Sequence, residues 1–322
     1  MSSRIFITGA SGRIGRHLVR YLVAQGHSVA ALCRNEGSEK ALRDDGAEPI
    51  RGDLQDTEAL RRGASDAEHL YHLAGGLRGP GRLTPHILNV EGTQSLLEAI
   101  RGMHRLQSFV YASSCAVYGD RSSLWVEEDF KPSPNTRYGQ SKVEAEDICL
   151  AALATSGLPV RIARIGAVYG ADFPFAMVDP IQNGNGWLPG EGRNCIPVIH
   201  IHDCVRALEM LAEHGENASI THISDRSSPS LREFYEAVHA QVGGEPMRFW
   251  STYIPSYVQY FAARNNERIQ SRLGQKARFT PDNLKLYTNS VRLKTHMLGD
   301  KLNFKWLYPS YEEGIKAAFG DP

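Results

Sequence analysis

Three glycines near the beginning of the chain constrain its fold more than any other feature. The apolar segment Arg4–Thr8 is followed by Gly9, Gly12 and Gly15, spaced G-x-x-G-x-x-G, and the amphipathic segment Arg13–Gln25 begins within that spacing. A tight turn between a strand and a helix, with close backbone approach to a pyrophosphate, requires glycine at such positions. The N–H groups and the positive dipole end of the helix then attract phosphate. We therefore predict a dinucleotide-binding strand–loop–helix unit here.

Short apolar runs alternate with amphipathic segments over the rest of the first half. This alternation predicts a parallel sheet, because a crossover helix has to connect successive parallel strands. The expected strands are Arg4–Thr8, Ser28–Leu32, Pro49–Arg51, Leu70–Leu73, Ser108–Ala112, Val160–Arg164, Pro197–Ile201 and Ser219–Ile223. The expected helices are Arg13–Gln25, Lys40–Asp45, Thr57–Gly63, Val90–Ile100, Tyr138–Thr155 and Val205–Glu213. We predict an α/β protein: a Rossmann doubly wound parallel sheet with a smaller, mainly helical C-terminal substrate domain.

The regular alternation of strand and helix patterns ends after Gly166. The segment Ile181–Gly192 is rich in glycine and asparagine, which is typical of a loop or lid, and the remainder of the chain is mainly helical in pattern. We predict a dinucleotide-binding domain over residues 1–165 and a substrate-binding domain over 166–322. Residues 199–224 are expected to return to the first domain.

Charge and hydropathy argue against several classes of protein. The 36 lysines and arginines balance the 36 aspartates and glutamates, so the overall charge gives no reason to expect a nucleic-acid or anionic-membrane partner. No run of about 18 apolar residues is present, and no basic-then-apolar leader precedes the first strand. The five cysteines are scattered without a C-x-x-C pair, a pattern typical of reduced thiols. We expect a cytoplasmic protein with no nucleic-acid, membrane or metal partner.

The end of the second expected strand bears on the choice between NAD and NADP. An acidic residue there would bind the 2′-hydroxyl of the adenosine ribose, but this chain has Cys33 followed by Arg34. A guanidinium at that place can pair with a 2′-phosphate, and Arg13 can contribute. The sequence favours NADP, while NAD stays open, because Arg34 can also be read as a solvated loop residue.

Further motifs occur in a fixed order over the first two-thirds of the chain. They are Gly52–Leu54, Tyr71–Gly75, Asn89–Thr93, Ser113–Gly119, Tyr138–Lys142 with the spacing Y-x-x-x-K, Arg164–Gly170 and His200–Asp203. Together with the glycine loop, this set resembles the extended short-chain dehydrogenase/reductase family, which contains the NAD-dependent epimerases and dehydratases.

The resemblance implies roles for the matching residues. Tyr138 would be the general acid/base, Lys142 would lower its pKa and hold the nicotinamide ribose, and Ser114 would hydrogen-bond the substrate oxygen. The glycine loop, Arg34 and the resemblance together give the expected cofactor-binding residues: Gly9, Ser11, Gly12, Arg13, Ile14, Gly15, Arg34, Asp53, Leu54, Leu73, Ala74, Gly75, Asn89, Tyr138 and Lys142. The family also implies a homodimer formed through the helices that contain Leu96 and Tyr138.

The chemistry of a tyrosine and a lysine four residues apart agrees with these roles. Moving a hydride to or from a carbon requires moving a proton on its oxygen. The ordinary pKa of a tyrosine is about 10. An ammonium group one helical turn away is expected to favour the phenolate and to bring this pKa toward working pH.

The expected substrate class follows from positions where nucleotide-sugar enzymes of the family carry polar residues. Dehydratases have an acidic pair after the serine, where this chain has Cys115 and Ala116. Many nucleotide-sugar enzymes have asparagine at the place of Ala167 and arginine at the place of Ile196. The apolar segment Asn194–His200 resembles the branch of 3β-hydroxysteroid dehydrogenases and dihydroflavonol reductases.

We therefore expect an NAD(P)-dependent oxidoreductase. It would transfer a hydride between nicotinamide and the ketone or secondary alcohol of a relatively apolar small molecule. The alternative is a nucleotide-sugar epimerase with tightly bound NAD. A second alternative is a family member that binds NADP without activity, against which the intact Ser114, Tyr138 and Lys142 argue.

Two histidines and a group of aromatic residues receive structural interpretations. His200 and His202 are expected on one face of a strand, where hydrogen bonding explains them better than a metal site, since no third ligand has a recognisable spacing. The aromatic residues are expected to pack or to line a pocket rather than to face a membrane, because charged residues interrupt such a face. They are Trp250, Tyr253, Tyr257 and Tyr260.

Overall fold

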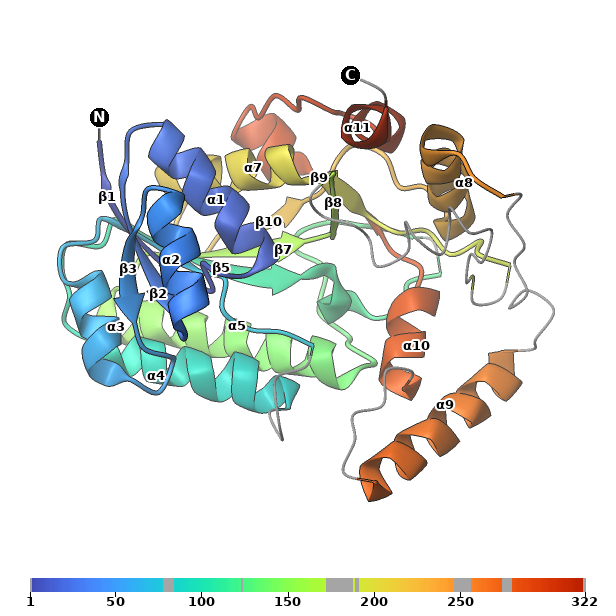
Figure 1. The fold of residues 1–322 in the computed structure, drawn as a ribbon, viewed down its shortest axis with the longest axis horizontal. Helices are drawn as coiled ribbons and strands as arrows, with labels where there is room; N and C mark the ends of the chain where they lie inside the picture. Colours follow the sequence, from blue (N-terminus) through green and yellow to red (C-terminus); the bar gives the residue numbers. More distant parts are fainter. Residues whose placement is uncertain are drawn as a thin grey trace.

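Seven strands form one parallel sheet at the centre of the molecule (Figure 1). They are β1 (Arg4–Thr8), β2 (Ser28–Cys33), β3 (Glu48–Arg51), β4 (His69–His72), β5 (Ser108–Ser114), β7 (Val160–Ile165) and β10 (Ile220–Ile223). Their order is β10-β7-β5-β4-β1-β2-β3, and every neighbouring pair is parallel. The chain therefore has the predicted Rossmann-like fold, with a topological switch between β1 and β4. The computed structural model describes residues 2–77, 84–122, 124–171, 188, 191–245, 256–273 and 280–320.

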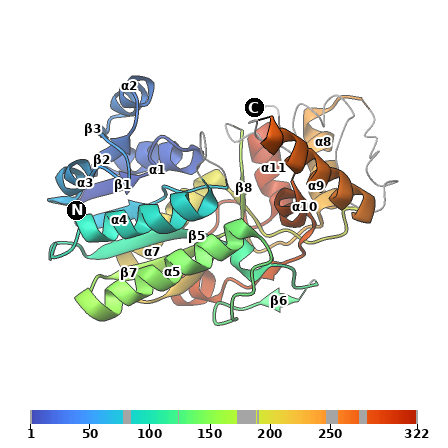
Figure 2. The same cartoon turned by 90° about the horizontal axis from the view of Figure 1, so that it is seen from below.

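Helices cover both faces of this sheet (Figures 1 and 2). On one face lie α1 (Arg13–Ala24), α2 (Glu36–Asp44) and α7 (Ile201–His214), and on the other lie α3 (Thr57–Ala64), α4 (Gly92–Ala99) and α5 (Arg137–Ser156). Alternation along the strands creates the two cores, because successive side chains point to opposite faces. In β1, Ile5 and Ile7 pack with α1 and α7, whereas Phe6 packs with the helices of the other face.

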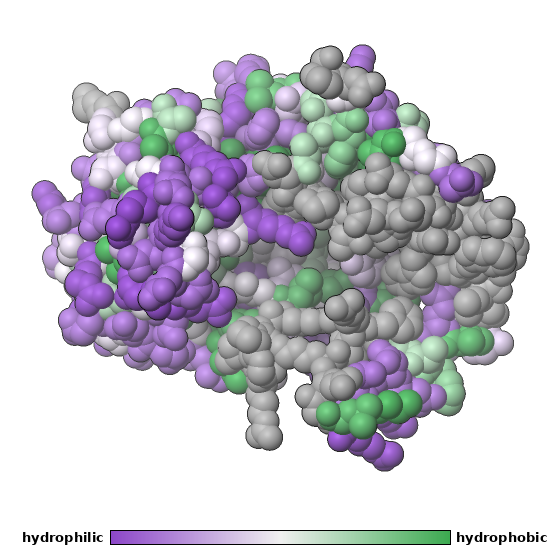
Figure 3. Space-filling model, viewed as in Figure 1, coloured by the Kyte–Doolittle hydropathy of each residue, from purple (hydrophilic) through white to green (hydrophobic). Residues whose placement is uncertain are grey.

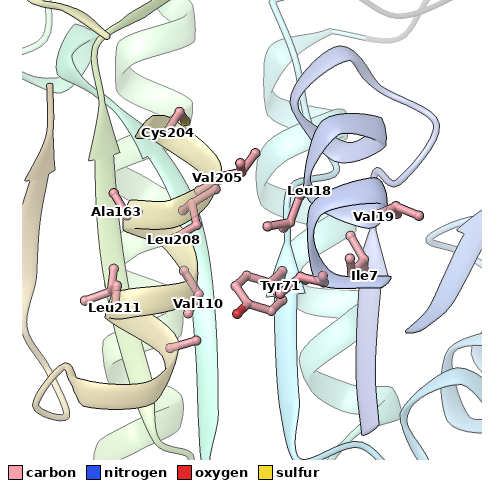
Figure 4. Packing of buried hydrophobic residues seen from close by; sticks show 14 of the residues in the cluster. Ile7, Leu18, Val19, Tyr71, Val110, Ala163, Cys204, Val205, Leu208 and Leu211 are labelled. Atoms are coloured by element: carbon pink, nitrogen blue, oxygen red, sulfur yellow. The ribbon is translucent and has the colours of Figure 1, made fainter. Parts of the chain in front are cut away.

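The core between the sheet and the helices α1 and α7 is shown from close by in Figure 4. Leu18 of α1 and Leu208 of α7 point toward the sheet and belong to the same packed cluster as Tyr71 and Val110 of its strands. All four side chains are buried, and each fully buried leucine stabilises the fold by about 1.5–3 kcal/mol. This packing fixes the strand ends from which the loops of the site emerge.

The second part of the molecule lies beyond the ends of strands β5 and β7. It contains two small parallel sheets, β8 (Ala167–Tyr169) with β9 (Val198–His200) and β6 (Trp125–Val126) with β11 (Arg292–Leu293). Its helices are α8 (Leu231–Val242), α9 (Ser256–Arg272), α10 (Pro281–Thr288) and α11 (Tyr311–Phe319), which lie together at one end of the molecule (Figure 2). Short helical turns occupy Ile87–Glu91, Cys115–Tyr118 and Met297–Lys301. The strand β10, between α7 and α8 in the chain, joins the large sheet beside β7.

His200 and His202 do not share a strand face, so that expectation is wrong. His200 ends β9, and its Nδ1 accepts a hydrogen bond from the backbone N–H of His202 at 3.2 Å. His202 lies in the first turn of α7, which begins at Ile201 rather than at the expected Val205. Burial lowers the pKa of His200 to about 4, and a neutral ring has the lone pair that this N-cap requires.

The expected aromatic group is divided by the structure. Trp250 and Tyr253 lie outside the described residues, as does most of the expected lid Ile181–Gly192. Tyr257 is 75% exposed and Tyr260 is 40% exposed. The prediction that these two side chains pack inside or line a pocket is therefore wrong. No helix in the described part of the chain is long and apolar enough to cross a bilayer.

Candidate active site

The glycine loop between β1 and α1 is packed too closely for side chains. A Cβ on Gly9, whose φ is +74°, would lie 2.5 Å from the backbone nitrogen of Ala74. A Cβ on Gly15 would lie 2.2 Å from the carbonyl oxygen of Gly9. Among the described residues, no side chain caps the N-terminus of α1 at Gly12, and the first turn of α1 contains no acidic residue. The N–H groups and the dipole of α1 are therefore available to an anion.

A cavity of about 460 Å³ opens beside this loop at the C-terminal ends of β1, β2 and β4. It is lined by Gly9, Ser11, Gly12, Leu32, Cys33, Arg34, Asp53, Leu54, Gln55, Leu73, Ala74, Gly75, Ile87, Leu88, Glu91 and Gly92. The lining contains every expected cofactor-binding residue except Arg13, Ile14, Gly15, Asn89, Tyr138 and Lys142. A cleft at the carboxyl ends of the strands and at the switch point is where doubly wound sheets bind ligands. The glycine cradle and this cavity fit a dinucleotide.

Several residues of this lining were not expected from the sequence. Ile87, Leu88 and Glu91 belong to a helical turn that leads into α4, and Gln55 follows the expected Asp53–Leu54 pair. Ile87 and Leu88 precede the motif that begins at Asn89, whereas Glu91 lies inside it. For the two apolar residues the signal was their position next to a cofactor motif, since ligand pockets are lined mainly by apolar side chains.

Asn89 joins the loop after β4 to the first turn of α5. Its Oδ1 accepts a hydrogen bond from the N–H of Gly76 at 2.9 Å, and its Nδ2 donates to Ser141 Oγ at 2.9 Å. Ser141 in turn donates to the carbonyl oxygen of Tyr138 at 2.8 Å. A Cβ on Gly75 would lie 2.4 Å from Asn89 Oδ1. The fully buried Asn89 thus supports the site from behind, outside the cavity lining.

Tyr138 lies in the first turn of α5 because of the residues around it. Thr136 caps the helix by accepting a hydrogen bond from the N–H of Gly139 at 3.1 Å. A Cβ on Gly139 would lie 2.4 Å from the carbonyl oxygen of Ala116, so this turn packs directly on the turn that follows β5. That close approach places Tyr138 beside the end of β5, where the hydroxyl of Ser114 is near enough to lower the pKa of the phenol.

Burial determines the acidity of Tyr138 in this structure. Burial raises the pKa of Tyr138 to about 12, against the opposing effect of the hydrogen bond with Ser114. The ammonium of Lys142 lies 6.0 Å from the centre of the Tyr138 ring and donates to the carbonyl oxygen of Ala112 at 2.7 Å. The expectation that Lys142 brings the pKa of Tyr138 toward neutrality is therefore wrong for this structure, because burial outweighs an ammonium that is directed elsewhere.

Lys142 lies between the rim of the cavity and Tyr138. A Cβ on Gly75 would lie 3.4 Å from its Nζ, and Nζ is 4.8 Å from the centre of the Tyr111 ring. Burial lowers the pKa of Lys142 to about 8, although Glu146 opposes this shift. The ammonium is therefore charged at neutral pH and loses its proton under mildly alkaline conditions.

The residue after Ser114 supplies no charge to the site. Burial raises the pKa of the Cys115 thiol to about 11, although a hydrogen bond with Ser114 lowers it. The next residue, Ala116, has no ionisable group. The surroundings of Tyr138 on this side are therefore neutral.

A group of side chains of metal-binding types lies away from this cavity, where His27 directly precedes β2 and the two glutamates belong to α7. Among the described residues, His27, Glu209 and Glu213 place ligand atoms within 4.8 Å of one another. The N–H of Ser3 donates to His27 Nδ1 at 3.2 Å. A neutral ring then carries its proton on Nε2, the nitrogen that faces Glu209 at 3.6 Å, and a protonated nitrogen cannot bind a metal.

Comparison with known proteins relates this arrangement to enzymes of known activity. A sequence profile of the NAD dependent epimerase/dehydratase family matches residues 5–224. The chain is 31% identical over 261 residues to 4-hydroxy-2-methyl-3-oxo-4-farnesyl-3,4-dihydroquinoline-1-oxide ketoreductase of Stigmatella aurantiaca. This alignment covers 76% of this chain and 77% of that protein. It is 24% identical over 245 residues to a decarboxylating sterol-4-alpha-carboxylate 3-dehydrogenase of Dictyostelium discoideum, over 72% of this chain and 74% of that protein.

Solved structures share the whole fold. A UDP-glucuronic acid 4-epimerase from Bacillus cereus, in complex with UDP-glucuronic acid and NAD, superposes with a TM-score of 0.76 at 21% identity. The superposition covers 98% of this chain and 97% of that one. At this identity the likeness establishes the fold alone.

Proposed function

The chain belongs to the NAD-dependent epimerase/dehydratase family, and on this basis we propose that it is an NAD(P)-dependent reductase or dehydrogenase of the extended short-chain type. It transfers a hydride between nicotinamide and the ketone or secondary alcohol of a relatively apolar small molecule. The observation that carries this proposal is the grouping of Tyr138, Ser114 and Lys142, with the ammonium of Lys142 6.0 Å from the centre of the Tyr138 ring. Cys115 and Ala116 leave these surroundings without a second acid.

The neutral surroundings of Tyr138 favour reduction or oxidation over dehydration. Elimination of water needs an additional acid and base at the substrate, and the neutral Cys115 and Ala116 occupy the positions where dehydratases carry them. A tyrosine that stays protonated at neutral pH is suited to donate its proton to a carbonyl oxygen. In the ketone direction, Tyr138 gives this proton while Ser114 hydrogen-bonds the same oxygen.

Two positions at which this chain differs from many nucleotide-sugar enzymes support an apolar substrate. Ala167 and Ile196 stand where many nucleotide-sugar enzymes carry asparagine and arginine, and here both pack against an apolar cluster that includes Tyr169 and Phe234. Two of the relatives, the ketoreductase and the sterol dehydrogenase, are named for a farnesylated quinoline and for a sterol. These observations argue for an apolar ketone rather than a sugar diphosphate.

The chain's own residues divide the binding of the cofactor between them. The bound cofactor supplies or accepts the hydride. The glycine loop and the N-terminus of α1 hold its pyrophosphate, with Arg13, Ile14 and Gly15 in the first turn. Asp53 and Leu54 line the same cavity and would flank the adenine, and Ala74 and Gly75 would hold the part of the dinucleotide toward Lys142.

We place NADP ahead of NAD because of Arg34. This residue is exposed at the end of β2 and lines the cavity, and no carboxylate of the described residues lies within ion-pair distance of it. We expect Arg34→Ala to weaken NADPH binding by about 10–100-fold, the equivalent of one charge-assisted contact, and to leave NADH binding nearly unchanged. Fluorescence titration with both nucleotides measures this, with Arg43→Ala on the outer surface of α2 as the matched control. Equal weakening of NADPH and NADH would assign Arg34 to the solvated loop.

The pKa of Lys142 predicts an alkaline limit to activity. The ammonium is present below its pKa of about 8 and is lost above it, so kcat/KM should fall as the pH rises through that value. In Lys142→Arg the charge persists to higher pH, and the alkaline limb should move upward even if the maximal rate is lower. A limb that stays in place in this variant would show that another group titrates.

An assay of purified protein with NADPH tests the proposed reaction. A panel that contains sterol-like and prenylated ketones together with UDP-sugars is incubated with NADPH, and loss of NADPH fluorescence reports turnover. We expect turnover of apolar ketones only. The alternative, a nucleotide-sugar epimerase with tightly bound NAD, has the support of the family profile, which covers epimerases and dehydratases. Conversion of a UDP-sugar without any ketone turnover would select it.

We also propose that the protein forms a homodimer through α4 and α5 and works in the cytoplasm. A groove of about 590 Å³ runs between α4 and α5, and Leu97, Ile148, Ala151 and Ala152 are among its lining residues. Small apolar side chains on two neighbouring helices suit close packing against the same helices of a second copy. The five cysteines are all free thiols, which suits a reducing compartment.

A further inference from the structure

Helix α9 exposes apolar side chains and turns polar ones toward the protein. Its exposed large side chains are Tyr257, Val258, Tyr260, Phe261 (65% exposed), Ile269 and, directly after it, Leu273 (63% exposed). Its buried or half-buried residues are Gln259, Ala263, Asn265, Asn266, Glu267 and Gln270. A surface helix of a globular protein ordinarily shows the opposite arrangement. A contiguous apolar face of this kind marks an interaction site.

The same outward face carries concentrated positive charge. Arg264, Arg268 and Arg272 are exposed and repeat every four residues, so they lie on one side of the helix. The only acidic residue of α9 is Glu267, which is turned inward and lies 3.7 Å from Arg137. Figure 3 shows the apolar patch over α9 in green, with hydrophilic atoms around it. In a chain with balanced charges, this combination of aromatic and arginine side chains is local to α9.

The position of α9 places this face close to the active site. Glu267 Oε1 contacts Arg137 Nη1, and Arg137 Nε lies 3.8 Å from Asp282 of α10. Arg137 immediately precedes Tyr138 in the first turn of α5. A surface bound to the outer side of α9 therefore lies across this helix from its contact with Arg137.

We propose that α9 docks the protein onto an anionic lipid surface. Tyr257, Tyr260 and Phe261 enter the headgroup layer. Amphipathic aromatic side chains are enriched at this interface between membrane and water. The arginines pair with lipid phosphates, as the basic residues of interfacial helices do. The helix lies in the plane of the surface and does not cross it.

A lipid surface suits this face better than a second copy of the chain. A two-fold interface repeats the same patch on both partners, so two α9 helices would bring three arginines of each copy against each other without an acidic partner on the helix. An anionic surface carries the complementary charge over its whole area. The expectation of no membrane partner came from the overall charge and from reading the charged residues of this helix as an interruption of a membrane face. In the structure the exposed arginines lie on the same side of α9 as Tyr257 and Phe261, where they suit an anionic surface.

Co-sedimentation with vesicles tests this docking without any catalytic turnover, so its outcome is independent of the proposed reaction. The vesicles contain phosphatidylcholine alone or phosphatidylcholine with phosphatidylglycerol. We expect the wild-type protein to bind the anionic vesicles at least about 10-fold more tightly than the neutral ones, and salt to weaken this binding. The double variant Tyr257→Ser/Phe261→Ser should lose most of the binding to the anionic vesicles.

Two further variants make the test specific. Arg264→Gln/Arg268→Gln should remove the preference for the anionic vesicles. Leu124→Ser, which replaces a side chain that is 60% exposed outside α9, should bind like the wild type. Because all of these side chains are exposed, circular dichroism should show every variant folded.

Two results would overturn the inference. The first is that the wild-type protein does not bind anionic vesicles, or that the α9 variants bind them as tightly as the wild type does. The second is a concentration-dependent association of the protein with itself, seen by sedimentation, that Tyr257→Ser/Phe261→Ser abolishes while vesicle binding is unaffected. That result would assign the face of α9 to a second copy.

Discussion

Replacing Tyr138 by phenylalanine is expected to lower kcat by about 10²–10⁴-fold, the range that general acid–base catalysis contributes. The variant lacks only the phenolic oxygen, which keeps its proton because burial raises the pKa of Tyr138 to about 12. The ring still fills its place in the first turn of α5, so the affinity for NADPH and the thermal stability should change little. The measurement is kcat with the apolar ketone that the NADPH assay identifies.

Tyr257→Phe is the matched control for this result, because it removes a phenolic oxygen from an exposed side chain on α9. It should leave kcat unchanged. A kcat for Tyr138→Phe that equals the wild-type value would remove Tyr138 from catalysis and would favour a cofactor-binding protein without this activity.

Replacing Arg164 by methionine is expected to lower the free energy of unfolding by about 3–5 kcal/mol, the usual cost of leaving one partner of a buried ion pair alone. Arg164 Nε lies 3.0 Å from Glu146 Oε1, and Arg164 Nη2 lies 2.6 Å from Glu146 Oε2. Both side chains are 3% exposed, and the hydroxyl of Ser113 also donates to Glu146. Urea denaturation measures the loss.

Two comparisons isolate the buried charge as its cause. The double variant Glu146→Leu/Arg164→Met removes both charges and should recover much of the stability. Arg43→Met breaks an exposed pair with Glu39 and should change the free energy of unfolding by less than about 1 kcal/mol. A loss of that small size in Arg164→Met would show that the buried pair does not stabilise the fold.

The pair belongs to a hydrogen-bond network that runs under the active site. Arg164 Nη1 donates to the hydroxyl of Tyr118 at 2.7 Å, and that hydroxyl lies 2.6 Å from His222 Nε2. Burial lowers the pKa of His222 to about 4, so the ring is neutral. Its Nδ1–H donates to the carbonyl oxygen of Lys294 at 2.6 Å, and Nε2 accepts from Tyr118. The network ties α5, which carries Tyr138 and Lys142, to β7, β10 and the segment after β11.

Most of the large sheet could be predicted because its strands are continuous apolar runs between turn signals. The two-residue strands β6 and β11 could not, because two residues show no periodicity. The start of α7 at Ile201 was not predicted because histidine is not among the residues that commonly cap helices. The prediction that Lys142 lowers the pKa of Tyr138 toward neutrality was wrong, because a spacing of four residues does not determine where a long side chain directs its ammonium.

Other parts of the site depend on contacts that no local pattern contains. Glu146 and Arg164 belong to a helix and a strand, and nothing in either segment marks the other as its partner. The tyrosines of α9 were visible in the sequence, but the sequence did not show that Gln259 and Ala263 face the protein while Tyr257 faces outward. The glycine loop and the motif around Tyr138 were predictable because their spacing itself carries the geometric requirement.

Identification of the nucleotide held by the purified protein tests the central claim most directly. The protein is denatured, and any nucleotide that it releases is identified and quantified. A reductase exchanges its cofactor in every turnover, so we predict no stoichiometric NAD, and we predict that the folded protein then binds NADPH more tightly than NADH. Stoichiometric, tightly held NAD would contradict this, because an epimerase returns the hydride to the same substrate and never needs to release its cofactor.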